Sequence, residues 1–339
     1  MTTPPVRPPP GARLLEMATG FFLSRLVYLA AKLGIADHLA DGPKSADELA
    51  LTTGSDATSL HRFLRTLTNF DILSLGPDGA FALTSLGEAL RNDAPGYTRS
   101  AILIMGSNAV WDAWRELPYV VDTGKPGFDK ANGKAMFDFL GDNPDDARWC
   151  SETMLAVHSA EPAAVAEAYD FSSAGVIVDV GGASGSMLAS VLTRHASPRG
   201  VLFDLPQATT EASALLRKRG VDSRVRLEHG SFFEGVPAGG DIYILSHIIH
   251  DWPEEQALAI LRDCREAMTP SSRLLLVELV LRDGGSPGHG SADMTMLVLF
   301  GAAERTAREY DALLAKAGLR ITRVIPTPAS ASIIEACVQ

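Results

Sequence analysis

The sequence predicts an α/β protein whose larger domain is a doubly wound, mostly parallel sheet, with a smaller helical domain in front of it. After residue 170, short apolar runs typical of buried strands alternate with amphipathic helical segments. Alternation of this kind favours a parallel sheet that is covered by helices. One run, at 176–180, passes directly into a glycine-rich turn. Before residue 100 the pattern is instead one of short helices and a hairpin.

The predicted elements of the larger domain follow from these periodicities. Strands are expected at 176–180, 200–204, 225–228, 241–246, 273–279, 320–325 and 332–338, and helices at 184–195, 208–219, 253–268 and 304–317. In the helix at 253–268, Pro253 suits the first turn. The apolar stripe of that helix is expected to consist of Ala257, Leu261, Cys264 and Met268.

The front of the chain has the element order of a winged helix. Apolar residues recur at helical spacing over 14–39. Ser45 and Glu48 form a capping-box pattern at the start of a second helix, and Asp56 suits the N-cap of a third. Two short apolar runs flank the turn at 76–79, which predicts a hairpin.

Charge and composition argue against several functional classes. The chain has 339 residues, 46% of them hydrophobic, and a formal net charge of −11, which is typical of a soluble two-domain enzyme and unfavourable for nucleic-acid binding. Residues 1–100 hold nine Lys plus Arg and ten Asp plus Glu, so this part of the chain offers little positive charge for contacts with DNA phosphates. Arg25 and Lys32 interrupt the apolar segment 21–36, which argues against a membrane span. Three scattered cysteines favour a reducing cytoplasm: Cys150, Cys264 and Cys337.

The turn after the run at 176–180 has the layout of a nucleotide-like cofactor site. Gly181, Gly182 and Gly185 carry no Cβ, so the backbone allows a ligand to approach closely. Asp204 ends the next apolar run, where its carboxylate is expected to accept hydrogen bonds from two ribose hydroxyls. A glycine turn that binds no ligand is the alternative.

The spacing of the glycines argues against a dinucleotide. The dinucleotide fingerprint needs glycine where this chain has Ala183 and Ser186. The pattern D-x-G-x-x-x-G resembles instead the first motif of class I S-adenosylmethionine (SAM) methyltransferases, whose ligand has no phosphate.

His250 is placed for acid–base chemistry. It follows the buried run at 242–246, and ligand sites in open α/β sheets lie at the carboxyl ends of strands. Glu278 ends another apolar run, and a carboxylate buried there needs a partner such as His250. Glu304 is expected at the start of the last long helix. From position alone, a structural role for His250 is equally open.

The segment around His250 also contains possible metal ligands. His247, His250 and Asp251 offer ligand atoms, but a further ligand at suitable spacing is missing, so no metal is expected. Asp251 fits equally well as the cap of the following helix and as part of the site.

Several motifs in order along the chain resemble the plant caffeate-type O-methyltransferases and their bacterial relatives. They are VDVGG at 178–182, FDLP at 203–206, GSFF at 230–233, HDW at 250–252, VE at 277–278 and ERT at 304–306. The likeness covers nearly the whole chain. It implies transfer of a methyl group from SAM to a small hydroxylated molecule, and a homodimer with interlocked N-terminal domains. The Pro-rich composition of residues 1–11 predicts a disordered tail. The resemblance implies a winged-helix-like dimerisation domain (12–100), a helical linker that contributes to the substrate pocket (101–170) and a SAM-binding catalytic domain (171–339).

The resemblance also implies roles for individual residues. His250 resembles the general base of the family, and Glu278 and Glu304 the carboxylates that flank it. The residues expected at the cofactor are Gly181, Gly182, Gly185, Asp204, Leu205, Ser231, Phe232 and Ser246. Those expected at the acceptor are Trp111, Met154, Asp251, Met294, Met296 and Phe300, and core packing is the alternative for the methionines among them.

Some positions depart from the family pattern. Ala183 replaces the usual third glycine, and Cys150 stands where an aromatic residue is frequent. Ser231 replaces a common Asp and is expected to weaken an adenine contact, and Ser246 replaces a frequent Lys. None of these departures involves His250, Glu278 or Glu304, so the methyl-transfer chemistry is expected to be retained.

In the expected mechanism, His250 is neutral near pH 7 and accepts the proton of the acceptor hydroxyl, while Glu278 or Glu304 holds its Nδ1–H. Two alternatives stay open. One is a SAM-binding relative with non-methylating chemistry, such as hydroxylation or decarboxylation. The other is a dimeric winged-helix regulator that senses a small ligand. The sequence does not name the acceptor.

Overall fold

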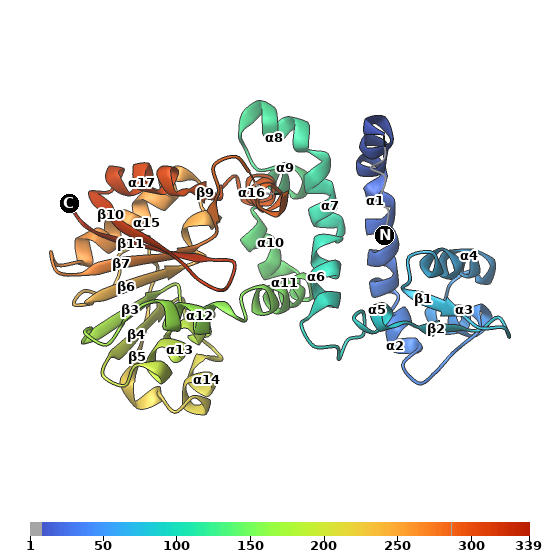
Figure 1. Cartoon of the computed structure of the whole chain (residues 1–339), viewed down its shortest axis with the longest axis horizontal. Helices are drawn as coiled ribbons and strands as arrows, with labels where there is room; N and C mark the ends of the chain where they lie inside the picture. Colours follow the sequence, from blue (N-terminus) through green and yellow to red (C-terminus); the bar gives the residue numbers. More distant parts are fainter. Residues whose placement is uncertain (1–8, 286) are drawn as a thin grey trace, which may run out of the picture. The chain divides into compact units, whose positions relative to one another are not determined.

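The computed structural model describes residues 9–285 and 287–339, which form two compact units (Figure 1). Unit 1 contains the described residues up to Trp111 together with Phe137–Val157. Unit 2 contains Asp112–Met136 and His158–Gln339. The segment 101–170, predicted as one linker, is therefore divided between the two units.

Unit 1 has the helices and the hairpin that the sequence predicts. Its elements are α1 (Pro10–Lys32), α2 (Ile35–His38), α3 (Ala46–Thr53), α4 (Ala57–Thr68), β1 (Leu73–Leu75), β2 (Phe81–Leu83), α5 (Ser85–Glu88), α6 (Thr98–Met105) and α11 (Pro144–Val157), while α7 (Asn108–Arg115) and α10 (Met136–Asp142) cross its boundaries. The capping box of Ser45 and Glu48 is confirmed, and Asp56 accepts a hydrogen bond from the backbone N–H of Ser59 at 2.8 Å. Of the predicted tail, residues 1–8 lie outside the described residues, whereas Pro10 and Gly11 already belong to α1.

Helix α1 is held in unit 1 by its polar residues and leaves an apolar face exposed. Arg25 donates a hydrogen bond to the carbonyl of Gly106 at 2.8 Å, and its guanidinium lies 4.8 Å from the centre of the Trp111 ring. The exposed large apolar residues of α1 are Leu14, Leu15, Met17, Phe21, Phe22, Leu23 and Leu29. Among the described helices, α1 alone has the length and apolar composition that would allow it to cross a membrane.

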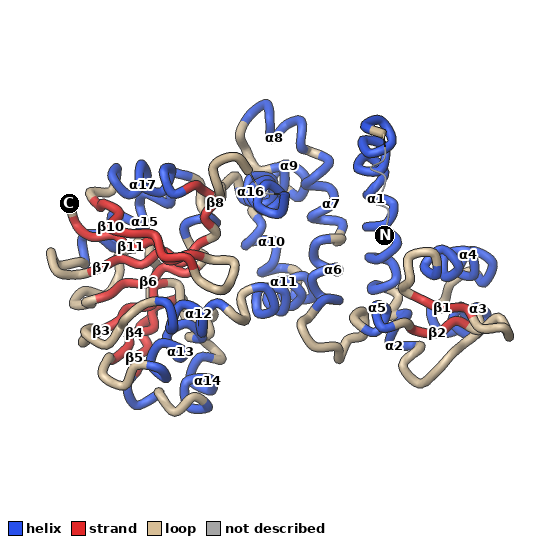
Figure 2. The backbone as a smooth tube through the Cα atoms, viewed as in Figure 1, coloured by secondary structure: helices blue, strands red, loops and turns tan. Residues whose placement is uncertain are grey.

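Unit 2 contains a seven-stranded sheet with the order β10-β11-β7-β6-β3-β4-β5 (Figure 2). Its strands are β3 (Val176–Val180), β4 (Arg199–Asp204), β5 (Val225–His229), β6 (Ile242–Ser246), β7 (Arg273–Glu278), β10 (Leu319–Pro326) and β11 (Ser332–Val338). The five strands from β5 to β7 pair in parallel, and β10 and β11 extend the sheet in antiparallel fashion. The predicted doubly wound, mostly parallel sheet is confirmed.

Helices cover both faces of this sheet (Figure 1). One face carries α12 (Glu161–Ala168), α13 (Ser186–Arg194) and α14 (Ala212–Lys218), and the other carries α15 (Glu254–Ala267) and α17 (Ala307–Lys316). The remaining elements of unit 2 are α8 (Leu117–Thr123), α9 (Gly127–Asn132), α16 (Pro287–Phe300), the short strands β8 (Val280–Leu281) and β9 (Arg305–Thr306), and the 3₁₀ turns η1 (Asp222–Arg224) and η2 (Ile249–Asp251).

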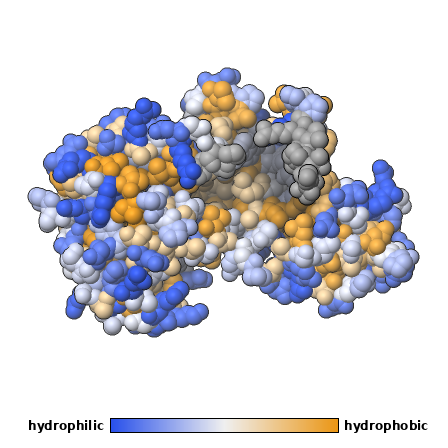
Figure 3. Space-filling view, in the orientation of Figure 1, coloured by the Kyte–Doolittle hydropathy of each residue, from blue (hydrophilic) through white to orange (hydrophobic). Residues whose placement is uncertain are grey.

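The two cores of unit 2 follow from the alternation of side chains along each strand. In β3, Ile177 packs into the core beneath α12 to α14, whereas Val178 and Val180 pack into the core beneath α15 and α17. Both faces are therefore buried, as expected for a near-continuous apolar strand. Burial also raises the pKa of Asp179, on the same strand, to about 7. On the outer surface shown in Figure 3, hydrophilic and hydrophobic residues are interspersed.

One detail of the sequence prediction is wrong, and one of two open alternatives for Asp251 is excluded. Glu304 does not start the last helix, because Thr306 is its N-cap and forms a capping box with Glu309. Asp251 does not cap α15, whose N-cap position is Pro253 without a side-chain hydrogen bond. Glu304 thus lies just before β9, and Asp251 lies in η2, so both carboxylates are available to the site.

Candidate active site

Four parallel strands bring the predicted cofactor residues to one edge of the sheet. Gly181 follows β3, Asp204 ends β4, Ser231 lies just beyond β5 and Ser246 ends β6. These strands are neighbours in the order β6-β3-β4-β5. Because parallel strands end at the same edge, residues from four distant segments of the chain come together there, which is the position of ligand sites in open α/β sheets.

The glycine turn needs its glycines for both conformation and space. Gly181 and Gly185 have φ values of +71° and +75°, in the left-handed region that favours glycine. A Cβ on Gly182 would lie 2.4 Å from the Leu202 side chain and 2.6 Å from Asp179. Ala183, which replaces the usual third glycine, also has a positive φ of 43°. The turn is therefore built on close contacts that larger residues would disturb.

Asp204 is oriented by the turn that it faces. Its Oδ2 accepts a hydrogen bond from the backbone N–H of Ala183 at 2.9 Å, and its Oδ1 accepts one from the N–H of Leu205 at 2.6 Å. Two backbone donors therefore fix the orientation of the carboxylate at the end of β4. Leu205 itself is exposed.

An aromatic group lies beyond β5. The Phe232 ring is 4.9 Å from that of Phe233 and 6.0 Å from that of Trp252, centre to centre. The hydroxyl of Ser231 accepts a hydrogen bond from the backbone N–H of Phe233 at 3.2 Å. Ser231 therefore closes the local turn beyond β5.

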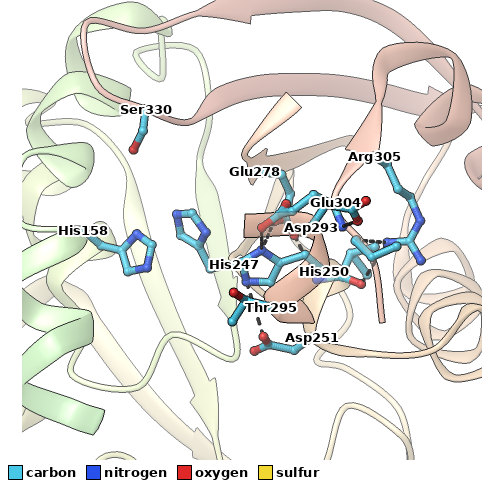
Figure 4. A network of polar contacts seen from close by, with 12 residues as sticks. His158, His247, His250, Asp251, Glu278, Asp293, Thr295, Glu304, Arg305 and Ser330 are labelled. Carbon is cyan, nitrogen blue, oxygen red and sulfur yellow. Dashed lines mark hydrogen bonds and ion pairs between the residues drawn. The ribbon is translucent and has the colours of Figure 1, made fainter. Parts of the chain in front are cut away.

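His250 lies among three carboxylates (Figure 4). Its Nδ1 is 2.9 Å from Oε1 of Glu304 and 3.4 Å from Oε2 of Glu278. Its Nε2 is 3.4 Å from Oδ1 of Asp251. The other oxygen of Glu278 accepts a hydrogen bond from the N–H of Ile249 at 2.9 Å. The predicted partnership of His250 with Glu278 and Glu304 is confirmed as geometry.

The carboxylates around His250 raise its pKa, which the sequence did not lead us to expect. Burial alone would lower the pKa of His250, but Glu278, Glu304 and Asp251 outweigh it and raise the pKa to about 10. Burial likewise raises the pKa of Glu278 to about 7 and that of Asp251 to about 6. The carboxylates around the ring therefore favour the imidazolium form of His250, whereas the sequence led us to expect a neutral ring near pH 7.

A second polar group adjoins the first, and the sequence analysis missed it. Glu161, at the start of α12, accepts hydrogen bonds from His158 at 2.9 Å, His247 at 2.5 Å and Ser330 at 2.7 Å. Its side chain is only 2% exposed. Hydrogen bonds from the two histidines keep the pKa of Glu161 well below its usual range despite burial. The spacing of His158 and Glu161, three residues apart, is the one local signal for this group.

The two groups also place possible metal ligands together. Ligand atoms of His158, Glu161 and His247 lie within 4.8 Å of one another, and so do those of His247, His250 and Glu278. In each set two ligands are three residues apart, and spacing along the sequence did not indicate the third, which comes from a distant segment.

The residues expected at the acceptor are distributed over both units. Trp111, at the end of unit 1, faces Arg25, and Met154 is exposed on α11 of unit 1. Met294, Met296 and Phe300 lie on α16 of unit 2 and are partly buried. Helix α16 packs against η2, the turn that carries His250 and Asp251.

Comparisons with known proteins identify the family of the chain. Residues 114–320 match the family model of an O-methyltransferase domain, and residues 15–93 match that of an O-methyltransferase dimerisation domain. The phenazine O-methyltransferase of Lysobacter antibioticus is 40% identical over 324 residues, which are 95% of this chain and 95% of the relative. The phenazine-1-carboxylate N-methyltransferase of Pseudomonas aeruginosa is 32% identical and covers 95% of this chain and 96% of its own.

A solved structure shows the same fold with ligands. An O-methyltransferase from neocarzinostatin biosynthesis, in complex with SAM and 2-hydroxy-5-methyl naphthoic acid, has a TM-score of 0.84 at 33% identity. It covers 94% of this chain and 96% of its own. The fold and the strand-end site define a class I SAM-dependent methyltransferase with an N-terminal helical dimerisation domain. The chain belongs to the O-methyltransferase family of small-molecule enzymes, and its cofactor is SAM.

Proposed function

We propose that this protein transfers the methyl group of SAM to a hydroxyl of a small aromatic or polyketide-like metabolite, with His250 as the general base. The observation that carries the proposal is the ring of His250, held through Nδ1 by Glu304 at 2.9 Å. This contact leaves Nε2 as the atom that receives the acceptor proton. The acceptors of the relatives support an aromatic substrate.

The protonation state of His250 defines the first step. SAM supplies an electrophilic methyl group on a sulfonium, and the acceptor oxygen must be an oxyanion or become one as it attacks. An imidazolium in the resting protein must lose a proton before it acts as a base, or it pairs with an acceptor that arrives as its oxyanion. When the acceptor binds as its hydroxyl, one proton leaves the buried site in each turnover, whereas an acceptor that binds as its oxyanion has already lost its proton to bulk water. This scheme needs no metal.

The cofactor residues fit SAM by position and chemistry. Asp204 offers a carboxylate for the ribose hydroxyls, and the turn from Gly181 to Gly185 gives backbone access without Cβ atoms. Phe232 presents an aromatic ring on the adenine side. Ser231, just beyond β5, and Ser246, at the end of β6, lie at the same edge of the sheet. Gly182 and Leu205 border the same turn and strand end.

The acceptor site involves Asp251 and helix α16. Asp251 lies 3.4 Å from Nε2 of His250, the atom that meets the acceptor. We assign Met294, Met296 and Phe300 on α16 to the acceptor site because this helix packs against η2. Trp111 and Met154, on unit 1, stay assigned to it by family resemblance alone.

The protein is expected to act in the cytoplasm as a homodimer that forms through its N-terminal domain. The match to a dimerisation domain and the exposed apolar face of α1 support this assembly. Replacement of Phe21 and Phe22 by Asp is expected to convert the dimer to a monomer in sedimentation velocity. A double replacement of the exposed Asp47 and Asp78 by Ala is the control, and a dimer that persists in the Phe21, Phe22 variant would contradict the assignment.

A transfer assay tests the proposed reaction. The protein is incubated with methyl-labelled SAM and a pool of phenolic, naphthoic and phenazine hydroxyl compounds, and products are detected by mass. A product that is one methyl heavier, with the label on oxygen, supports the proposal. Binding of SAM without formation of S-adenosylhomocysteine across the pool would favour the non-methylating alternative.

A nitrogen acceptor is the second candidate function. The relative from Pseudomonas aeruginosa is named an N-methyltransferase of phenazine-1-carboxylate. Amine and heteroaromatic nitrogen compounds therefore belong in the same pool, and the position of the label in the product separates the two reactions.

A further inference from the structure

The proposed base and its carboxylate partner lie on segments that are far apart in the sequence. His250 lies in η2 and Glu304 lies just before β9, and a hydrogen bond of 2.9 Å joins them across 54 residues. Misplacement of a reacting group by about 1 Å can lower a rate by about 100-fold. The backbones of the two segments must therefore be held at a fixed separation by other contacts.

Two contacts hold the segment of Glu304 but do not involve η2. Strand β8 begins at Val280, just after Glu278, and pairs in parallel with β9. In this ladder Val280 lies opposite Arg305. On α16, Asp293 accepts a hydrogen bond from the backbone N–H of Glu304 at 3.1 Å. These contacts fix Glu304 relative to Glu278 and to α16.

Arg305 connects the segment of Glu304 to η2. Its side chain lies near Glu304 in Figure 4, and the residue is only 8% exposed. Nη1 donates a hydrogen bond to the carbonyl of Ile249 at 3.3 Å and another to the carbonyl of Ala303 at 3.0 Å. Ile249 directly precedes His250, and Ala303 directly precedes Glu304. One nitrogen therefore binds the peptide group that leads into the base and the peptide group that leads into its carboxylate partner.

The turn that carries His250 is held at Ile249 from two sides. The backbone N–H of Ile249 donates a hydrogen bond to Oε1 of Glu278 at 2.9 Å, and its carbonyl accepts the one from Arg305. Ile249 itself is buried. The guanidinium of Arg305 also lies against α17, since its Cζ is 5.9 Å from the centre of the buried ring of Tyr310. These contacts fix the backbone from which the imidazole of His250 extends.

We propose that Arg305 is a positioning residue that sets the separation and angle between His250 and Glu304. It does so by holding the carbonyls of Ile249 and Ala303 at one nitrogen. In this role Arg305 acts through the backbone and not on the acceptor or on SAM. The inference rests on the proposed function for its effect on rate, whereas its effect on the contact between His250 and Glu304 does not depend on that function.

Arg305→Lys separates the position of the donor from its charge. Lysine keeps the positive charge, but its ammonium nitrogen is one bond closer to the backbone than Nη1 of arginine and lacks the planar geometry of the guanidinium. The two carbonyls therefore lose their shared donor while the charge is retained. Arg308→Lys, on the exposed surface of α17, makes the same exchange away from the site and is the matched control.

The first test does not require catalysis. In the full-length resting protein, the proton between Nδ1 of His250 and Glu304 is followed by NMR as a ring N–H signal, assigned by its absence in His250→Asn. Arg305→Lys is expected to speed the exchange of this proton with water several-fold, because the hydrogen bond that protects it is no longer held in place. Arg308→Lys should leave the exchange unchanged. If Arg305→Lys does not unfold cooperatively with heat, Arg305→Gln takes its place. Exchange at the wild-type rate would overturn the proposal, whatever reaction the protein performs.

The second test uses turnover at saturating SAM and acceptor. Arg305→Lys is expected to lower kcat by about 10-fold or more while the Kd for SAM stays near that of wild type, because the glycine turn and Asp204 lie at the ends of β3 and β4. In Arg305→Ala, guanidinium ion added well below denaturing concentrations should restore part of the lost kcat. Methylammonium ion, which carries the same charge without the planar donor group, should not.

The outcomes distinguish positioning from general support of the fold. Equal losses of kcat and of SAM affinity in Arg305→Lys, without rescue of Arg305→Ala by guanidinium, would show that Arg305 only stabilises the protein and would overturn the proposal. Failure of wild type to transfer a methyl group would reject the proposed function, and the NMR test would still decide whether Arg305 positions His250 against Glu304.

Discussion

Glu304 accepts a hydrogen bond from Nδ1 of His250 at 2.9 Å across 54 residues of sequence. The contact fixes which nitrogen of the ring is free for chemistry, because Nδ1 is engaged and Nε2 is turned toward Asp251. It also places an anion against the ring, which stabilises the imidazolium that forms when a hydroxyl proton is taken up. One contact therefore sets both the orientation and the charge of the base.

Glu278→Gln is expected to shift the pH dependence of transfer. The substitution keeps an oxygen for the N–H of Ile249 and removes a charge 3.4 Å from Nδ1 of His250. Because carboxylates raise the pKa of His250 above its ordinary value, loss of one must lower it. The neutral ring is then present at lower pH, and the inflection of kcat/KM should move to lower pH by about one unit or more.

The same acceptor is used for wild type and Glu278→Gln, so its own ionisation affects both profiles equally. Glu255→Gln, on the exposed surface of α15, serves as the control and should not shift the profile. Identical inflections for Glu278→Gln and wild type would show that Glu278 does not set the protonation of His250.

Asp204→Ala is expected to weaken SAM binding and to affect chemistry little. Loss of hydrogen bonds to a charged acceptor predicts an increase in Kd of ~10–100-fold, measured by calorimetry. At saturating SAM, kcat should stay near the wild-type value. Asp222→Ala, which removes an exposed acid of η1, is the matched control. An unchanged Kd would reject the role of Asp204 at the ribose.

Asp179→Asn is expected to stabilise the fold at neutral pH and above. Burial raises the pKa of Asp179 from 3.8 to about 7, so the folded protein binds this proton more tightly than the unfolded chain does. The resulting stability is complete below about pH 4 and is lost as pH rises toward and through 7, at roughly 1.4 kcal/mol for each pH unit between the unfolded and folded pKa values. The advantage of the variant in Tm should therefore widen between about pH 4 and pH 7 and level off above that range. If the Tm values of Asp179→Asn and of wild type change with pH in parallel, the burial of Asp179 does not affect stability in this way.

Much of the fold and the inner site could be predicted because their signals are local. The bounds of β3 were predicted to the residue, and the carboxyl ends of β3, β4 and β6 located the glycine turn, Asp204 and His250. The partnership of His250 with Glu278 followed from the cost of an unpaired buried carboxylate. Family resemblance added Glu304.

The parts that sequence could not reveal depend on tertiary contacts. Glu161 and His247 are 86 residues apart, and neither position has a pattern that indicates the other. Helix α16 contains Gly288 and Gly290 near its start, which weaken its helical signal. The raised pKa of His250 depends on the summed charge of three carboxylates from separate segments, so spacing along the chain could not predict it.

The most direct test of the central claim compares His250→Asn with wild type in transfer of labelled methyl from SAM to the acceptor found in the pool. Asn is close to His in size and hydrogen bonding but cannot accept the proton. The account predicts a fall in kcat of about 100-fold or more, with the Kd for SAM near that of wild type. Near-normal transfer by His250→Asn would contradict the assignment of His250 as the base.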